Sequence, residues 1–283
     1  MKLNLTKKSK TILNDKTNIL EVDIPPELFL RHPSSLPWVN SAFAGGFAPT
    51  QVIMLTGDAG AGKTTLALQL ADSLTAAEHT VLYNSKEESI DQIAAKCKQL
   101  SLKSGFTPSD HQRAPELLEQ ADRMMKEIKN KAKHHFFLIQ DSLPTLDDGF
   151  YKDGAMNSKT PMRACTKLAE WAKASAATVI FINHVNKDGT FVGKNTVKHA
   201  IDAHATLRAD KKTGYRHFAI EKNRFGANND TFIVTLGASG LSLVRTVTKI
   251  AGQEPSESES GDEGGNVVSM DEGRRRRGRR VNL

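Results

Sequence analysis

The feature that most constrains this chain is a glycine-rich segment at residues 57–64, with the sequence GDAGAGKT. It matches the pattern G-x-x-x-x-G-K-[ST] of a phosphate-binding loop. An apolar, β-rich run at residues 52–56 precedes it, and leucines at a spacing of four residues (66, 70 and 74) follow it. A strand–loop–helix context of this kind is typical of an α/β protein, and it makes a chance glycine-rich turn a poor explanation.

The spacing of the motif has a chemical reason. Glycines let the backbone curl so that successive N–H groups point at phosphate oxygens, and the helix that follows adds the positive end of its dipole. Lys63 is expected to reach the β- and γ-phosphates, and the Thr64 hydroxyl is expected to coordinate Mg²⁺. The sequence therefore predicts ATP and Mg²⁺ as cofactors. The residues assigned to nucleotide binding are Gly57, Asp58, Ala59, Gly60, Ala61, Gly62, Lys63, Thr64 and Thr65.

Short apolar runs alternate with helix-period segments over most of the chain. Nearly continuous apolar strands between helices predict an α/β core, with a mainly parallel sheet covered by helices on both faces. The last two runs lie closer together, which predicts antiparallel strands at one edge. The six predicted strands are Val52–Thr56, Val81–Tyr83, Phe136–Ile139, Val179–Ile182, Phe218–Ile220 and Phe232–Leu236.

Composition divides the 283 residues into three regions. Residues 1–35 are expected to form an N-terminal arm or a lead-in strand around residues 19–24, and residues 36–248 the ATPase core. Residues 249–283 are acidic, contain few apolar residues and end in an arginine run, so we expect a disordered tail.

The charge is unevenly distributed along the chain. The formal net charge is +7. The last 33 residues hold seven acidic residues and six arginines, which leaves 33 basic and 25 acidic residues, a net charge of +8, in the rest. A basic body suggests a polyanionic partner, although charge of this size also serves solubility alone.

The chain is expected to work in the cytoplasm, near the nucleoid. Its two cysteines, Cys97 and Cys165, lie in predicted helices and are too few for a disulfide scaffold, which fits a reducing compartment. The polar, basic start has no apolar core of a signal peptide, and no run approaches the roughly 20 apolar residues of a membrane span.

Polar residues follow three of the predicted strands. Asp141 ends the third run, at the sheet edge where α/β proteins bind ligands, and is expected to hold the Mg²⁺ shell; capping a helix is the alternative. Glu87 or Glu88 is expected to polarise the attacking water. Alternatively, Ser85 and Glu88 form the cap at the start of a helix. Both interpretations hold together if Glu88 caps the helix and Glu87 polarises the water. His184 ends the fourth run and is either a γ-phosphate sensor or a surface residue.

Together these segments resemble the RecA superfamily, and within it the bacterial RadA (Sms) DNA-repair ATPases. The similarity covers about residues 36–248 and implies a RecA-like P-loop NTPase core. It rests on GGFAP at 45–49, the phosphate loop, NSKEES at 84–89, HVNKDG at 184–189 and, most specifically, KNRFG at 222–226.

The resemblance implies roles for matching residues. Glu87 matches the catalytic glutamate, His184 the γ-phosphate-sensing position, and Lys222 and Arg224 a basic pair inserted into a neighbour's nucleotide site; an exposed basic strand end is the alternative. Two loops are expected to bind single-stranded DNA through aromatic and basic side chains, although solvated mobile loops would have the same composition. Their candidate residues are Phe150, Tyr151, Lys152, Lys187, Phe191, Lys194 and Lys198.

The resemblance predicts a homo-oligomer, either a ring, with a hexamer expected, or a filament. It also predicts an Mg²⁺-dependent, DNA-stimulated ATP hydrolase of homologous recombination, branch migration or repair. We expect the family's four-cysteine zinc element and its Lon-protease-like domain to be lacking. The main alternative is a non-motor accessory of a recombinase or replication protein, or a replicative-helicase-like factor. A small-molecule P-loop kinase is a further alternative.

Overall fold

A single sheet organises the protein. The computed structural model describes residues 18–24, 26–130, 133–184, 199–226, 230–248 and 256–258. Ten strands in these ranges pair in the order β10-β9-β8-β7-β6-β1-β5-β4-β2-β3. Their bounds are β1 Val52–Gly57, β2 Thr80–Ser85, β3 Thr107–Ser109, β4 Phe136–Asp141, β5 Thr178–His184, β6 Ala203–Ala209, β7 Arg216–Asn223, β8 Asp230–Gly237, β9 Gly240–Thr248 and β10 Ser256–Ser258.

The sheet has a parallel and an antiparallel part. From β6 through β1, β5, β4 and β2 to β3 all neighbours are parallel. From β6 through β7, β8 and β9 to β10 all neighbours are antiparallel. The predicted fold class, a mainly parallel sheet with antiparallel edge strands, is confirmed.

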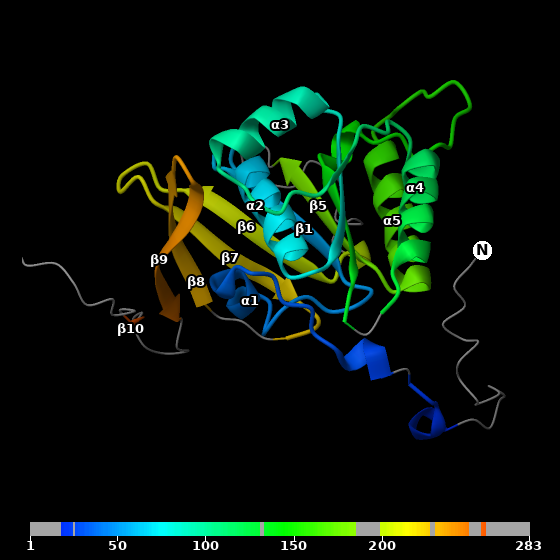
Figure 1. The fold of residues 1–283 in the computed structure, drawn as a ribbon, viewed down its shortest axis with the longest axis horizontal. Coiled ribbons are helices and arrows are strands. Elements are labelled where there is room, and N and C mark those ends of the chain that lie inside the picture. Colours follow the sequence, from blue (N-terminus) through cyan, green and yellow to red (C-terminus); the bar gives the residue numbers. More distant parts are fainter. Residues whose placement is uncertain are drawn as a thin grey trace, which may run out of the picture.

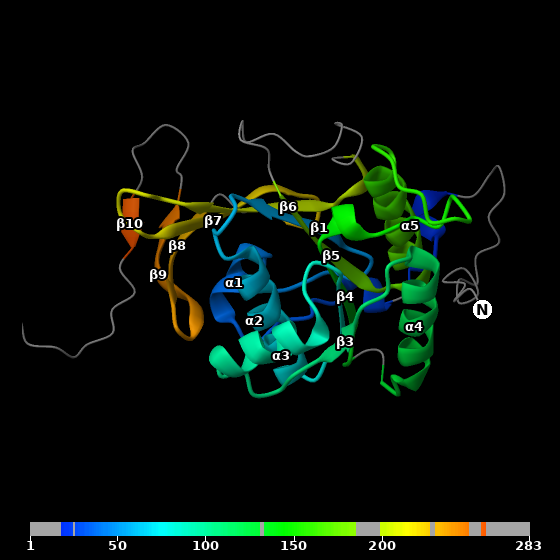
Figure 2. The same ribbon diagram turned by 90° about the horizontal axis from the view of Figure 1, so that it is seen from above.

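Helices cover both faces of the parallel part, and Figures 1 and 2 show α1, α2 and α3 on one side of it and α4 and α5 on the other. Among the described residues, no helix combines the length and the apolar character needed to cross a membrane. The α-helices are α1 Pro37–Ala42, α2 Lys63–Ala76, α3 Ile90–Gln99, α4 Ala114–Glu127 and α5 Thr160–Ser175, and the 3₁₀ turns are η2 Ile19–Glu21, η3 Pro26–Phe29 and η4 Leu143–Thr145.

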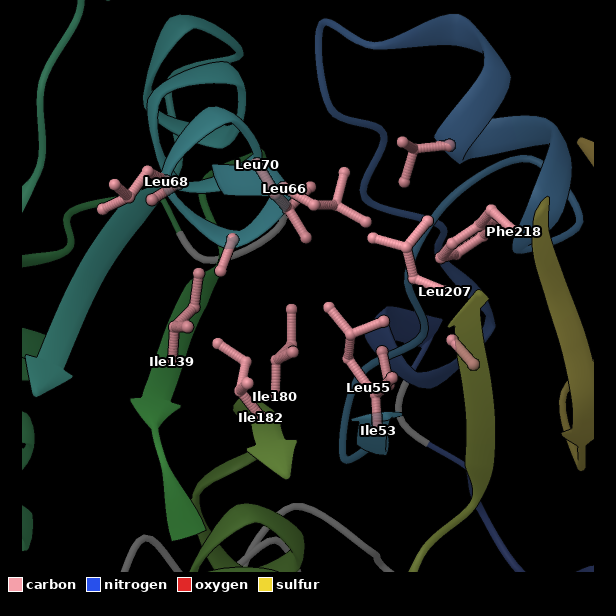
Figure 3. Packing of buried hydrophobic residues seen from close by; sticks show 14 of the residues in the cluster. Ile53, Leu55, Leu66, Leu68, Leu70, Ile139, Ile180, Ile182, Leu207 and Phe218 are labelled. Carbon is pink, nitrogen blue, oxygen red and sulfur yellow. The ribbon is translucent and has the colours of Figure 1, made fainter. Parts of the chain in front are cut away.

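The side chains of strand β1 pack into two separate hydrophobic cores, because successive side chains of a strand point to opposite faces. Ile53 and Leu55 pack with Leu66 and Leu70 of α2 in the first core, which Figure 3 shows. Val52 and Met54 pack into the second core, against α4 and α5. Every residue of β1 is buried, which explains its continuous apolar run.

All six predicted strands are present, but β3, β6, β9 and β10 were not predicted. Strand β6 shows why: Ala203, Ala205 and Leu207 enter the first core, while Arg208 on the other face is exposed. An alternating strand lacks the continuous apolar run that marked the others. Within the predicted tail, the structure describes only Ser256–Ser258, which pair with β9.

Of the two alternatives for the first region, the lead-in strand around residues 19–24 is wrong. Residues 19–21 form the turn η2, because the Asn18 side chain accepts a hydrogen bond from the backbone N–H of Leu20 at 3.0 Å. The alternative helix start at Ser85 is also wrong, although the Ser85 hydroxyl accepts a hydrogen bond of 3.4 Å from the backbone N–H of Glu88. Helix α3 begins four residues later, where Ser89 and Gln92 form a reciprocal capping box.

Three buried histidines join the segment before α1 to the starts of two strands. The rings of His32 and His135 stack with centroids 4.0 Å apart, and His79 meets His32 edge-on at 5.5 Å. His32 is tied to the core by paired backbone hydrogen bonds with Phe47. Burial, followed by the nearby His79 and Arg31, lowers the pKa of His32 to about 4, and burial also lowers the pKa values of His79 and His135.

We expect the free energy of unfolding to fall as the pH drops from about 6.5 to about 4. The unfolded chain binds protons on these histidines that the folded chain excludes, so the folded state loses stability as the pH approaches the lowered pKa of His32. Urea unfolding at pH 7, 6 and 5 measures this slope. His32→Phe keeps a stacked ring and should make the slope shallower. An unchanged slope in His32→Phe would contradict this account.

Candidate active site

The phosphate loop begins where β1 touches β6. Gly57 lies beside Leu207 in the register, and a Cβ placed on Gly57 would lie 1.9 Å from the carbonyl oxygen of Leu207. Only glycine is compatible with this approach. Gly60 and Gly62 have φ of +75° and +102°, a backbone region that favours glycine. The loop therefore turns sharply from the strand into α2.

Helix α2 begins at Lys63 with Gly62 as its N-cap, and no side chain caps it. Its first backbone N–H groups therefore face the loop, as anion binding requires. The Lys63 side chain folds back into the loop, where its ammonium donates hydrogen bonds of 2.8 Å to the carbonyls of Gly57 and Asp58. Burial lowers the pKa of Lys63, and the charges of Asp141 and Asp58 partly oppose this shift.

Asp141 lies at the end of β4, next to the start of α2. Its Oδ2 atom accepts hydrogen bonds from the Thr64 hydroxyl at 2.9 Å and the Tyr83 hydroxyl at 2.8 Å. The carboxylate is 2% exposed, and burial raises its pKa in spite of these two donors. The predicted partners Thr64 and Asp141 therefore lie in direct contact.

These residues fit a magnesium ion. The Oδ1 atom of Asp141 is buried and has no hydrogen-bond partner within the described part of the chain. A hydroxyl and a carboxylate are hard oxygen donors, which suit Mg²⁺. Thr64 and Asp141 would hold the ion or its water shell, and a bound ion would compensate the orphaned oxygen.

The two glutamates after β2 have different surroundings. Glu87 accepts a hydrogen bond from the hydroxyl of Ser142, the residue after Asp141, so its carboxylate is held at the end of β4. Glu88 instead forms an ion pair with Lys96 of α3. This geometry favours Glu87 over Glu88 as the residue next to the γ-phosphate. The Glu88 carboxylate pairs with Lys96 and does not cap a helix.

The other predicted residues lie at the end of β5, in the two predicted DNA loops and at the end of β7. His184 pairs in register with Gly57 at the end of β5, so its backbone lies beside the phosphate loop. In the first predicted DNA loop, Phe150 is 66% exposed and Tyr151 and Lys152 are also exposed. The candidate residues of the second loop lie outside the described residues: Lys187, Phe191, Lys194 and Lys198.

Lys222 and Arg224 do not join the phosphate loop of their own chain. Arg224 forms an ion pair of 3.1 Å with Asp202, which binds the backbone of Val52 at the start of β1. The phosphate loop follows Gly57, at the other end of that strand. Five residues of strand separate the two ends by roughly 17 Å.

Sequence reasoning missed Tyr83, Ser142 and Asp202. A signal for Tyr83 was available, since a tyrosine in an otherwise apolar buried strand needs a hydrogen-bond partner. Burial raises the pKa of Tyr83 well above its usual value, so it remains a hydrogen-bond donor to Asp141. Ser142 and Asp202 carried no such signal, because a serine or an aspartate beside a strand end is ordinary and the fold alone brings in their partners, 55 and 22 residues away.

Fold and site together define a P-loop ATPase with a RecA-like core. Residues 21–190 match the family model described as "AAA domain". The chain belongs to this family.

Comparison with individual proteins confirms the resemblance to RadA. The chain is 30% identical to the DNA repair protein RadA of Haemophilus influenzae over 221 residues, which cover 78% of this chain and 46% of the relative. It is 28% identical to RadA of Bacillus subtilis over 239 residues, or 83% and 49% of the two chains. The chain thus spans about half the length of the curated relatives it matches.

Solved structures share the fold. A KaiC-like protein of Pyrococcus horikoshii superposes with a TM-score of 0.61 at 18% identity, covering 76% of this chain and 98% of that one. A DnaB-like replicative helicase superposes with a TM-score of 0.65 at 12% identity, covering 74% of this chain and 61% of that one.

Replacing Asp141 with asparagine should stabilise the protein and abolish its hydrolysis of ATP. Burial raises the pKa of Asp141, so its charge costs free energy at neutral pH, and an amide oxygen can still accept from Thr64 and Tyr83. We expect the free energy of unfolding without ligand to rise by about 1 kcal/mol. Urea unfolding at pH 7 without ligand measures the stability, a second series with Mg-ATP measures ligand binding, and phosphate release from ATP measures hydrolysis. Equal stabilisation of both proteins by Mg-ATP would contradict the assignment of Asp141.

Proposed function

We propose that this chain hydrolyses Mg-ATP at sites shared between neighbouring copies in an oligomer, and that single-stranded DNA stimulates the reaction. It would serve homologous recombination, branch migration or DNA repair. One observation supports the proposal most strongly: the predicted catalytic residues lie at opposite ends of strand β1. Lys63, Asp141 and Glu87 converge at one end of β1, and Arg224 is bound at the other.

Each residue of the first group has a chemical task. The ammonium of Lys63 exchanges its two loop carbonyls for phosphate oxygens when nucleotide binds. Glu87 accepts a proton from the water that attacks the γ-phosphate, and Ser142 orients its carboxylate through their hydrogen bond. A bound Mg²⁺ neutralises charge that develops on the phosphate oxygens. Thr64 and Asp141 would hold it.

Lys222 and Arg224 act on the neighbour's nucleotide. Arg224 is half exposed, so its guanidinium is accessible to a second copy. Its strand end is too far from its own phosphate loop for a direct role there. A cation supplied in trans stabilises the charge on the transferring phosphoryl group and contributes about 10³–10⁵ in rate. Hydrolysis would then depend on assembly.

The loop after β4 provides a surface suited to single strands. The guanidinium carbon of Arg163 lies 4.7 Å from the centre of the Phe150 ring, and the rings of Phe150 and Tyr151 meet edge-on at 4.9 Å. Buried carboxylates anchor the loop, since Asp148 pairs with Arg163 and Asp147 pairs with Arg113. Exposed rings on an anchored loop can stack on bases without reading their sequence.

The relatives support the cellular role. The two RadA proteins are named as DNA repair proteins, and the replicative helicase that shares the fold is named as DnaB-like. In a ring or filament of identical subunits, Arg224 of one copy would lie next to the phosphate loop of its neighbour.

ATP hydrolysis, measured with and without single-stranded DNA at several protein concentrations, tests the proposal. The specific rate should rise with DNA and with protein concentration, because each site needs a neighbour. Lys63→Ala should remove the activity, and Arg224→Ala should lower kcat by about 10³-fold. If the rate of hydrolysis is independent of DNA and of protein concentration, a non-motor accessory protein is favoured instead. If phosphate is transferred to a small molecule, a P-loop kinase is favoured.

A mixture of two inactive variants tests the shared site directly. The Lys63→Ala variant still has Arg224, which can enter a neighbour's nucleotide site. The Arg224→Ala variant still has an intact phosphate loop, which can accept that arginine. Mixing them should restore activity well above the sum of the separate proteins. No gain on mixing would contradict a site built from two copies.

Phe150→Ala should weaken the binding of single-stranded DNA. Loss of one stacking ring is expected to cost about 1–3 kcal/mol of binding free energy. Fluorescence anisotropy with a labelled oligonucleotide measures the affinity. Tyr215→Ala, at a ring 40% exposed beyond the end of β6, is the matched control and should bind as the unchanged chain does. Equal affinities in all three proteins would remove Phe150 from the DNA site.

A further inference from the structure

A buried carboxylate lies between Arg224 and the strand that leads into the phosphate loop. Asp202 is 5% exposed and directly precedes β6. Its Oδ2 atom accepts a hydrogen bond of 3.0 Å from the backbone N–H of Val52, and its own N–H donates to the Val52 carbonyl at 2.8 Å. These contacts fix the carboxylate to the start of β1.

The other oxygen of this carboxylate binds the guanidinium. Nη1 of Arg224 lies 3.1 Å from Oδ1 of Asp202, and the Arg224 backbone N–H donates to the Asp202 carbonyl at 3.0 Å. Both the backbone and the side chain of Arg224 are therefore held by one residue. Because an arginine side chain has several rotatable bonds, an isolated strand end would leave its charge spread over many positions.

The residues before Asp202 hold the second cation. The ammonium of Lys222 donates to the carbonyl of Ile201 at 2.6 Å, and Nη2 of Arg224 approaches the carbonyl of His199 at 3.5 Å. Burial and the neighbouring Arg224 lower the pKa of Lys222, and Asp202 opposes this shift. The segment 199–202 thus presents oxygen atoms to both basic side chains.

We propose that Asp202 is a positioning residue that orients Arg224 for the nucleotide site of the neighbouring copy. The inference rests on the proposed function, because it needs a cation that acts in trans. Asp202 touches no nucleotide itself. It acts by holding the guanidinium in one place while half of that side chain stays exposed.

Asp202→Asn separates this role from folding. The amide oxygen of asparagine can still accept from Val52, while its NH₂ group faces the guanidinium and removes the ion pair. We expect kcat to fall about 10- to 100-fold, as a misplaced catalytic group does. The KM for ATP should change little, because the cation acts mainly in the transition state.

Mixing identifies which copy carries the defect. In a mixture with Lys63→Ala, the intact phosphate loop of Asp202→Asn receives a correctly held Arg224 from the partner, and activity should return. In an Arg224→Ala background, Asp202→Asn should cause no further loss, because both changes act through the same guanidinium. Asp72→Asn is the control: this carboxylate also accepts backbone N–H groups, at 2.7 Å from Ser104 and Gly105, and its replacement should leave kcat unchanged.

The outcomes are separable. If Arg224→Ala is rescued by Lys63→Ala but Asp202→Asn is not, Asp202 acts on its own phosphate loop and the positioning role is overturned. An unchanged kcat in Asp202→Asn overturns it as well. If neither variant is rescued, the shared site of the proposed function fails, and the role of Asp202 fails with it.

Discussion

The position of strand β1 determines the site. Its backbone is paired with β5 on one side and β6 on the other, and its side chains fill both cores. At one end, Gly57 lies so close to the Leu207 carbonyl that no side chain fits. At the other, Val52 is bound to Asp202. The phosphate loop and the held arginine are therefore placed by one rigid strand, and neither depends on loop packing alone.

The site contains charges that are costly to bury. Lys63 is 5% exposed and Asp141 is 2% exposed. A buried charge must be paired or hydrogen-bonded, and here loop carbonyls satisfy the lysine while two hydroxyls satisfy one oxygen of the aspartate. The second oxygen has no such partner among the described residues. Polar groups arranged in this way lower stability in exchange for ligand binding, which is a common cost of function.

Sequence and structure agree best where the chemistry is local. The spacing from Gly57 to Thr64 follows from the curl of one loop, so the pattern alone predicted both the loop and the start of α2. The alternative start of α3 at Ser85 was wrong, because two cap patterns, at residues 85–88 and 89–92, follow one another directly and the local rule does not rank them. Strand β6 was missed because only one of its faces is apolar, so its sequence lacks the continuous apolar run that marked the predicted strands.

By itself the sequence determined the class of fold, the phosphate loop and the identity of Asp141 and Glu87 as candidate residues. The fold class follows from the alternation of apolar runs and helical segments along the chain, the loop and Asp141 follow from short local patterns, and Glu87 was separated from Glu88 by the family resemblance. The tertiary structure decided which glutamate meets Ser142, that Tyr83 supports Asp141, and that Arg224 lies with Asp202 at the far end of the sheet. These contacts join residues 22 to 58 positions apart. They depend on strand order and register, which no local pattern specifies, because hydrophobic burial sets the order of the whole sheet.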